Sequence, residues 1–419
     1  MGLRIGTRWW MISLVTIGTV LNYLARSSLS VAAPTLKHAF DMSTQEYSWV
    51  VGAFQAAYTV MQPVAGYVLD LVGLRLGFAL FAVGWSVANM LHGLASGWPM
   101  LAFFRGLLGL TEAAAIPAGL KTVTEWFPPR ERTVATGWFN IGASIGAMIA
   151  PPIVVTCIAL WGWRSAFVVT GGLGLIWAGL WYVLYRSPTE HGGVGEAERA
   201  HILGDRPIVS AEAPIGWRAV LFTRDFWSIA IPRFLADPAW QTFSFFIPLY
   251  LVEVKGMDLK GIAAFAWLPF LAADAGALLG GYYAPWLMRV FGTSLIGSRK
   301  IVVATGAMLM IGPACIGLTV SPGAAIALFC IGGFAHQMLS GALITLAADL
   351  FDERVVATAT GLAGSAAWIG GLSFSLIIGA LADTIGYPPL FVCLAVFDLI
   401  GTAVLWTLLR RPRAEVQGA

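Results

Sequence analysis

The chain has 419 residues, of which 58% are hydrophobic and 11% are charged, and its formal net charge is +3. A soluble domain carries about 25% charged residues, so this composition excludes a water-soluble enzyme and a disordered chain. The net charge is too small to indicate nucleic-acid binding. The four cysteines all fall in apolar stretches, where they indicate packing rather than disulfides.

Apolar segments long enough to cross a bilayer occur twelve times along the sequence, since one such helix needs about 20 apolar residues. The predicted spans are 9–33, 45–69, 76–95, 98–120, 133–160, 164–185, 225–252, 261–288, 299–319, 322–348, 355–380 and 386–409. The first apolar run continues past Asn22 without a cleavage-site pattern. It is therefore predicted to be an uncleaved first span rather than a signal peptide.

A polar segment separates the spans into six and six. The predicted organisation is an N-terminal six-helix bundle at 1–186, a cytoplasmic linker at 187–220 and a C-terminal six-helix bundle at 221–419. Most Lys and Arg residues outside the spans fall on the side of the two termini. Those on the other side are Lys37, Arg164, Lys255 and Lys260. The positive-inside rule then predicts that both termini are cytoplasmic.

The loop after the second span carries the pattern G-x-x-x-D-x-x-G-x-R, formed by Gly66, Asp70, Gly73 and Arg75. Its glycines allow a tight turn, and its Asp and Arg can cap helix ends or bridge neighbouring helices. The pattern resembles the motif A loop of the major facilitator family. Together with the spans, it predicts an all-α membrane protein with twelve transmembrane helices in two pseudo-symmetric halves.

Several ionisable residues fall inside the predicted spans, where a charge at the bilayer centre costs about 2.5–3.5 kcal/mol. They must face a cavity or one another, and they are candidates for function by default. These residues are Arg26, Arg105, Glu112, Arg233, Asp237, Asp274 and Asp398.

Arg26 is the principal candidate for substrate binding. Asn22 and Tyr23 precede it by four and three residues, so all three share one helix face. Tyr58 and Gln62 form a second polar pair in the next span. A guanidinium beside amide and phenol groups suits a ligand with one carboxylate and several hydroxyls. The alternative is that Arg26 pairs internally with Glu112, and one arginine can exchange these partners during transport.

Glu112 is the principal candidate for proton coupling. Burial opposes ionisation of a carboxylate and a neighbouring arginine favours it, so the two effects together can allow proton exchange. Arg105 lies two helical turns before Glu112 on a similar face. Arg105 is predicted to be structural or to tune the proton affinity of Glu112. The alternative is a permanent ion pair between the two residues.

Candidates in the second half are less specific. Arg233 and Asp237 have the i, i+4 spacing of an ion pair, whereas Asp274 and Asp398 have no evident partner. His336 lies four residues before Ser340, and both a packing role and a substrate contact stay open. No enzyme motif, Walker loop or metal-ligand spacing occurs, so no catalysis, cofactor or metal is expected.

Longer stretches carry a closer resemblance. The motifs N-Y-x-x-R at 22–26, R-G-x-x-G-x-x-E-A at 105–113 and E-W-F-P-x-x-E-R at 125–132 resemble the anion:cation symporter branch of the major facilitator superfamily. Residues 56–70, 125–152, 232–251 and 379–399 are similar to bacterial hexuronate transporters. This resemblance implies import of glucuronate or galacturonate with protons across the bacterial inner membrane. A monomer is expected for this architecture.

The resemblance also implies roles for individual residues. Arg26 would bind the substrate carboxylate beside Tyr23 and Tyr58, and Glu112 would couple the proton. From the resemblance, Asp70 and Arg75 belong to the cytoplasmic gate, and Ser340 and Trp368 contact substrate. Many relatives carry an Asp directly before the first-span arginine, where this chain has Ala25. Glu112 is therefore the only obvious proton site of the first half.

Three other functions remain open. The first is proton symport of another sugar acid, an aldonate or aldarate. The second is organic anion exchange, which needs no titrating Glu112. The third is a nutrient sensor that binds ligand without moving it, although the sequence contains nothing like an appended signalling domain.

Overall fold

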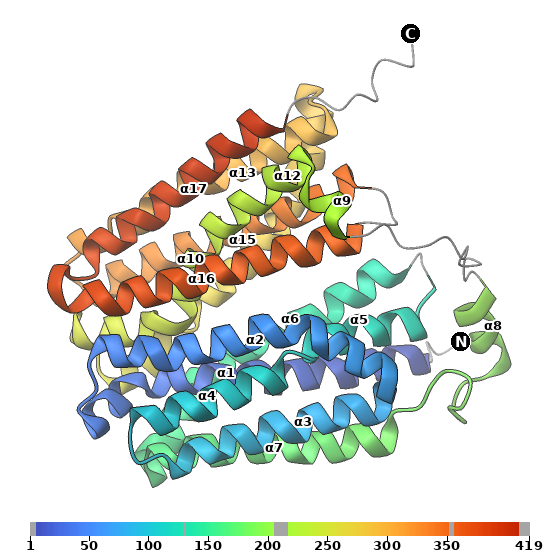
Figure 1. Ribbon diagram of the computed structural model, residues 1–419, viewed down its shortest axis with the longest axis horizontal. Helices are drawn as coiled ribbons and strands as arrows, with labels where there is room; N and C mark the ends of the chain where they lie inside the picture. Colours follow the sequence, from blue (N-terminus) through green and yellow to red (C-terminus); the bar gives the residue numbers. More distant parts are fainter. Residues whose placement is uncertain (1–5, 129–130, 205–216, 352–355, 410–419) are drawn as a thin grey trace. The chain divides into compact units, whose positions relative to one another are not determined.

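The computed structural model is helical throughout and describes residues 6–128, 131–204, 217–351 and 356–409 (Figure 1). Its contacts divide the chain into two compact units. The first comprises Met1–Ala211 with Asp258–Trp267, and the second comprises Glu212–Met257 with Leu268–Ala419. The division along the chain falls within the polar segment 187–220, although residues 205–216 of that segment lie outside the described residues.

Before residue 205, the first unit contains six long helical stretches and one short helix. They are α1 (Thr7–Phe40), α2 (Thr44–Val72), α3 (Leu74–Leu91), α4 (Trp98–Glu112) continued by α5 (Ala115–Trp126), α6 (Arg132–Trp161), α7 (Trp163–Leu184) and the short α8 (Glu196–Gly204). The principal pairs are α1 with α6, α2 with α4 and α3 with α7. The short helix α11 (Leu259–Phe265) also belongs to this unit and packs on α6.

The second unit repeats this plan. Its helices are the short α9 (Trp217–Leu221), α10 (Arg224–Glu253), α12 (Leu268–Phe291), α13 (Leu295–Leu309) with the short α14 (Ile311–Ala314), α15 (Pro322–Leu350), α16 (Val356–Ile385) and α17 (Pro388–Leu408). Here α10 pairs with α16 and α12 with α15, while α13 packs on both α15 and α17, as α3 packs on both α4 and α7. Equivalent helices thus meet in the two units, and the predicted pseudo-symmetry of two six-helix halves is confirmed.

Nine helical stretches in the described part of the chain are long and apolar enough to cross a membrane. Three further helices of comparable length, α1, α2 and α10, complete the predicted twelve. These three are also the helices that carry Arg26, Tyr58 and Arg233. Because polar groups are retained in a membrane helix mainly for function, the least apolar helices are where the site is expected.

Glycines of α6 let this helix approach the backbone of α1. A Cβ built on Gly142 would lie 2.6 Å from the main-chain oxygen of Thr16, and one on Gly146 would lie 2.4 Å from that of Val20. No side chain larger than hydrogen fits there without movement. These two glycines therefore allow α6 and α1 to pack closely.

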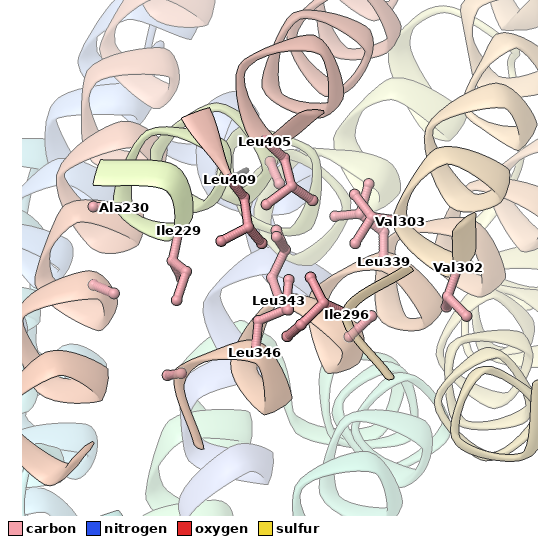
Figure 2. Close-up of a cluster of buried hydrophobic side chains, with 14 of the residues drawn as sticks. Ile229, Ala230, Ile296, Val302, Val303, Leu339, Leu343, Leu346, Leu405 and Leu409 are labelled. Carbon is pink, nitrogen blue, oxygen red and sulfur yellow. The ribbon is translucent and has the colours of Figure 1, made fainter. Parts of the chain in front are cut away.

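Each unit has a core of its own. In the first unit, Trp177 and Trp181 of α7 and Tyr185, which follows α7 directly, recur at every fourth position and stack with ring centroids 5.6 and 4.2 Å apart. In the second unit, a cluster of aliphatic side chains comes from α10, α13, α15 and α17 (Figure 2). Those labelled in Figure 2 are Ile229, Ala230, Ile296, Val302, Val303, Leu339, Leu343, Leu346, Leu405 and Leu409, which follows α17 directly.

The start of α1 is capped by a residue far away in the sequence. Gly6, at the N-cap position, has no side chain to accept a hydrogen bond. Instead Glu198 of α8 accepts from the main-chain N–H groups of Thr7 and Arg8, both at 3.1 Å. Arg8 also pairs with Glu198 and with Glu131, at 3.3 and 3.1 Å. The polar segment after α7 is thus fastened to the first helix.

The glycine contact between α6 and α1 can be tested by a single methyl group. We expect Gly146→Ala to lower the free energy of unfolding by about 1–3 kcal/mol, because the added Cβ must displace the α1 backbone beside Tyr23. Gly137→Ala on the same helix is the control, since its Cβ meets nothing within 4 Å. Unfolding of the two purified variants measures the difference. Equal stability of the two would contradict the tight contact.

Candidate functional site

Arg26 lies in the middle of α1, 8% exposed, among aromatic rings. Its guanidinium carbon is 4.5 Å from the ring centre of Tyr23, 4.8 Å from that of Tyr58 and 5.1 Å from that of Phe54. The negative faces of such rings attract a cation and replace part of its lost hydration. The predicted association of Arg26 with the two tyrosines is present in the structure.

Arg26 also forms an ion pair with Glu112. Its Nε donates to Oε2 of the carboxylate at 2.9 Å, and the Glu112 side chain is fully buried. The second oxygen, Oε1, has no hydrogen-bond partner among the described residues. The internal pairing considered as an alternative for Arg26 is thus what the structure contains. The pair leaves hydrogen-bonding capacity free on the carboxylate.

The local sequence explains why Glu112 lies at the end of α4. Pro117 has no N–H to donate to the carbonyl of Ala113, and its ring crowds that carbonyl. The helix is interrupted there and resumes as α5. Earlier in α4, a Cβ on Gly109 would lie 2.4 Å from the main-chain oxygen of Phe54, so this glycine allows α4 to approach α2 closely.

Arg105 supports the pair through the backbone. Its Nη2 donates to the main-chain oxygen of Arg26 at 2.9 Å, and its guanidinium carbon lies 5.1 Å from the Phe54 ring centre. Among the described residues it forms no ion pair with Glu112, and its Nε and Nη1 have no hydrogen-bond partner. Arg105 therefore holds α1 at Arg26, while its role in tuning Glu112 stays a prediction.

Asn22, Tyr58 and Gln62 complete the predicted first-half set. Asn22 is fully buried, and neither atom of its amide group has a hydrogen-bond partner in the described part of the chain. Gln62 is half-buried one helical turn after Tyr58. A fully buried amide without partners is costly, so Asn22 is available to a polar ligand.

Phe54 is a site residue that sequence reasoning missed. Its ring lies beneath both arginines, 5.1 Å from the guanidinium carbon of each. A signal was present, since Phe54 precedes Tyr58 by four residues and therefore shares its helix face. Phe54 is apolar, whereas the residues predicted for this part of the site were chosen for their polar or charged side chains.

The predicted gate residues are only partly described. Nε of Arg75 donates to the main-chain oxygen of Tyr182 at 2.8 Å, and its guanidinium carbon lies 4.5 Å from the Tyr182 ring centre. Arg75 thereby caps the C-terminal end of α7, as expected for a cation at that position. The side chain of Asp70 lies outside the described residues, so the gate stays a prediction.

The second unit gives Asp237 a different partner from the predicted one. The carboxylate accepts a hydrogen bond from Gln241 Nε2 at 3.0 Å, one turn further along α10. Arg233 forms no ion pair with any described residue. Among the described residues the predicted Arg233–Asp237 ion pair is therefore absent, and the carboxylate instead accepts from the amide of Gln241, at the same spacing on the other side.

His336 of α15 is buried against an aromatic ring. Its imidazole stacks on Trp240 of α10 with centroids 5.8 Å apart and planes 15° apart, and its Nδ1 has no partner among the described residues. Ser340, one turn further along α15, and Trp368 of α16 are half-buried. The structure thus joins His336 to Trp240, whereas the substrate contacts of Ser340 and Trp368 stay predictions.

The comparisons with known proteins agree with this architecture. The family model "Major Facilitator Superfamily" matches residues 15–296 and 286–419. The hexuronate transporter of Escherichia coli strain K12 is 53% identical over 98% of this chain and 96% of its own length. The galacturonate transporter of Dickeya chrysanthemi is 50% identical over 77% of this chain and 94% of its own.

A solved structure supports the fold alone. A bacterial homologue of the human lysosomal transporter Spinster, in an inward-facing and occupied conformation, superposes with a TM-score of 0.77. It covers 96% of each chain at 17% identity.

Two six-helix halves with a charged pair buried in one of them define a membrane transporter rather than an enzyme. The chain belongs to the Major Facilitator Superfamily.

The buried ion pair makes a prediction about stability. Arg26→Met leaves Glu112 buried without its cation, and we expect the free energy of unfolding to fall by about 3–5 kcal/mol. Adding Glu112→Leu removes the unpaired charge and should recover most of that loss. Unfolding in detergent micelles measures both variants. A double variant less stable than the single one would contradict this account.

A surface carboxylate provides the control for that experiment. Glu131 pairs with Arg8 and His201, and its side chain is 28% exposed. Glu131→Gln should cost less than about 1 kcal/mol, because exposed ion pairs are screened by water.

Proposed function

We propose that this protein imports a hexuronate, galacturonate or glucuronate, together with protons by alternating access. The observation that carries the proposal is the buried Arg26–Glu112 pair, whose cation lies against Tyr23 and Tyr58. Two transporters that are at least half identical to this chain are named for hexuronate and galacturonate, which supports the same substrates here. The 30% identity with the D-galactonate transporter of Escherichia coli O6:H1 makes aldonates the second candidate class.

The substrate chemistry follows from the groups near Arg26. A planar guanidinium can bind a carboxylate through two parallel hydrogen bonds. Asn22 has a buried amide that can both donate to and accept from sugar hydroxyls, and the tyrosines add phenol groups. In the proposed site, Gln62, His336, Ser340 and Trp368 complete the substrate contacts.

The proton and the substrate compete through Arg26. Only one anion at a time can occupy the guanidinium side that now contacts Glu112. When Glu112 takes up a proton, it loses its negative charge and releases Arg26 to bind the substrate carboxylate. When the proton leaves, Glu112 attracts Arg26 again and the substrate is expelled. Arg105 keeps Arg26 in place through its main-chain oxygen.

The proposed cycle needs two moving bodies and a defined orientation. In the proposal, the bundles 1–186 and 221–419 rock about the site, the linker 187–220 joins them, and Asp70 and Arg75 close the cytoplasmic side. The distribution of Lys and Arg supports a bacterial inner-membrane protein with both termini in the cytoplasm. A single chain contains both bundles, so a monomer suffices.

Transport by the purified protein tests the proposal. We expect radiolabelled galacturonate or glucuronate to accumulate in proteoliposomes when an inward proton gradient is imposed. Glu112→Gln resembles the protonated acid permanently, so gradient-driven accumulation should be lost while exchange of labelled for unlabelled substrate continues. Glu46→Gln is the matched control, because Glu46 is a half-buried carboxylate at the start of α2, away from Arg26, and glutamine preserves its helix-capping role.

The alternatives give different results in the same assay. Saturable uptake that ignores the gradient in the unmodified protein would contradict symport and indicate a facilitator or an exchanger. Failure to transport either hexuronate would overturn the substrate assignment, and aldonates and aldarates would then be assayed. Binding without any transport would indicate a sensor.

A further inference from the structure

Asp398 of α17 is a buried acid that the proposed cycle does not use. Only 2% of the residue is exposed, and neither carboxylate oxygen has a hydrogen-bond partner among the described residues. Thr402, one turn further along α17, also has a buried hydroxyl without a partner. Unpartnered buried oxygens are rare in folded proteins and each requires an explanation.

The surroundings of Asp398 can be worked out from the packing of α17 on α10. A Cβ on Gly401 would lie 3.2 Å from Cα of Pro232, and Arg224 donates to the main-chain oxygen of Thr407 at 2.8 Å. These two contacts show that the helices run antiparallel. One turn earlier on α17 than Gly401, Asp398 therefore faces α10 near Ala236, which is buried and apolar.

Among the described residues, no cation on the neighbouring helices pairs with Asp398. On α10, Arg224 donates to the main-chain oxygen of Thr407, and Arg233 has no ion pair with a described residue. Lys300 of α13 donates to the main-chain oxygen of Leu409 and lies 5.4 Å from the ring of Trp406. These contacts at the end of α17 are eight or more residues beyond Asp398, or at least about 12 Å along the helix.

The remaining charged groups of these helices have partners of their own or lie at the surface. On α10, Asp237 accepts a hydrogen bond from Gln241. On α13, Arg299 pairs with Asp349 of α15 at 3.2 Å. Asp383 of α16 is exposed. The ionisable groups around α17 therefore give an ionised Asp398 no compensation in the described part of the chain.

Burying an ionised carboxylate away from water and from any cation costs far more free energy than burying the neutral acid in the same place. We propose that Asp398 is a proton-binding site of the second unit, which holds its proton while α17 packs on α10 and loosens that packing when the proton leaves. The ligand is a proton rather than a metal cation, because no group of three or more metal-ligating side chains occurs among the described residues.

The site bears on transport through α10. This helix lies against α17 at Pro232 and against α16 at Asp237, where a Cβ on Gly371 would lie 2.6 Å from Oδ2. A change in the packing of α17 therefore acts on the helix that carries Asp237, Trp240 and Gln241. The inference is independent of proton coupling at Glu112 and stands whether or not that proposal holds.

The test compares the pH dependence of stability with and without the acid. Thermal unfolding of the purified protein is followed from about pH 6 to about pH 10, a range in which an ordinary aspartate is already ionised. We expect the unfolding temperature of the unmodified protein to fall by several degrees toward high pH. In Asp398→Asn, which resembles the neutral acid, that fall should be largely absent.

Three further arms make the result decisive. Asp349→Asn, which removes an ion-paired carboxylate, should leave the alkaline fall in place. Asp398→Leu should fold and resist high pH as Asp398→Asn does, because the site accepts a neutral side chain. Replacing sodium by choline in the buffer should leave the dependence of the unfolding temperature on pH unchanged for every variant.

The inference is overturned by parallel pH curves for Asp398→Asn and the unmodified protein. It is overturned equally if both neutral variants fail to fold, since that result requires the charged form. A fall that appears only in the absence of sodium would also overturn it, because it would identify a metal cation as the ligand.

Discussion

The ion pair between Arg26 and Glu112 is the constraint on which the rest of the first unit depends. Two opposite charges removed from water are tolerated only when they stay together or when one is neutralised. The surrounding rings and the backbone bond from Arg105 keep the cation in position. One oxygen of the carboxylate has no hydrogen-bond partner in the part of the chain that the structure describes. The pair is thus stable while both charges stay together. An anion that competes for Arg26, or a proton that neutralises Glu112, weakens it.

The helices bring these two residues together through small local features. Gly109 lets α4 approach α2, and Gly146 lets α6 approach α1. Pro117 interrupts the fourth span directly after Glu112, so the carboxylate lies at the end of a regular helix rather than within one. Each feature is a single residue. The two glycines let two helix backbones come close together, and the proline ends a regular helix.

The sequence was sufficient for the fold and for part of the site. The spans and the two halves follow from hydropathy, and Arg26 stands out because a charged side chain in an apolar span is costly unless it has a function. Helical spacing identified Tyr23 as its neighbour. Helical spacing did not identify the partner of Asp237. Arg233 and Gln241 both lie four residues from Asp237 on the same helix, and side-chain packing decides which of them contacts the carboxylate. Which helices meet, and hence the contact of Phe54 with both arginines, is likewise a tertiary property.

The matching helix pairs of the two halves have diverged in their chemistry. In the first half, α1 and α4 carry an arginine and a glutamate that attract each other as charges. In the second half, the equivalent helices α10 and α15 carry Trp240 and His336, which stack as flat rings. Equivalent helices of the two halves thus carry different chemistry, a buried ion pair in the first half and a pair of stacked rings in the second. Exchanging the two pairs would therefore be expected to preserve the architecture while moving the buried ion pair into the second half.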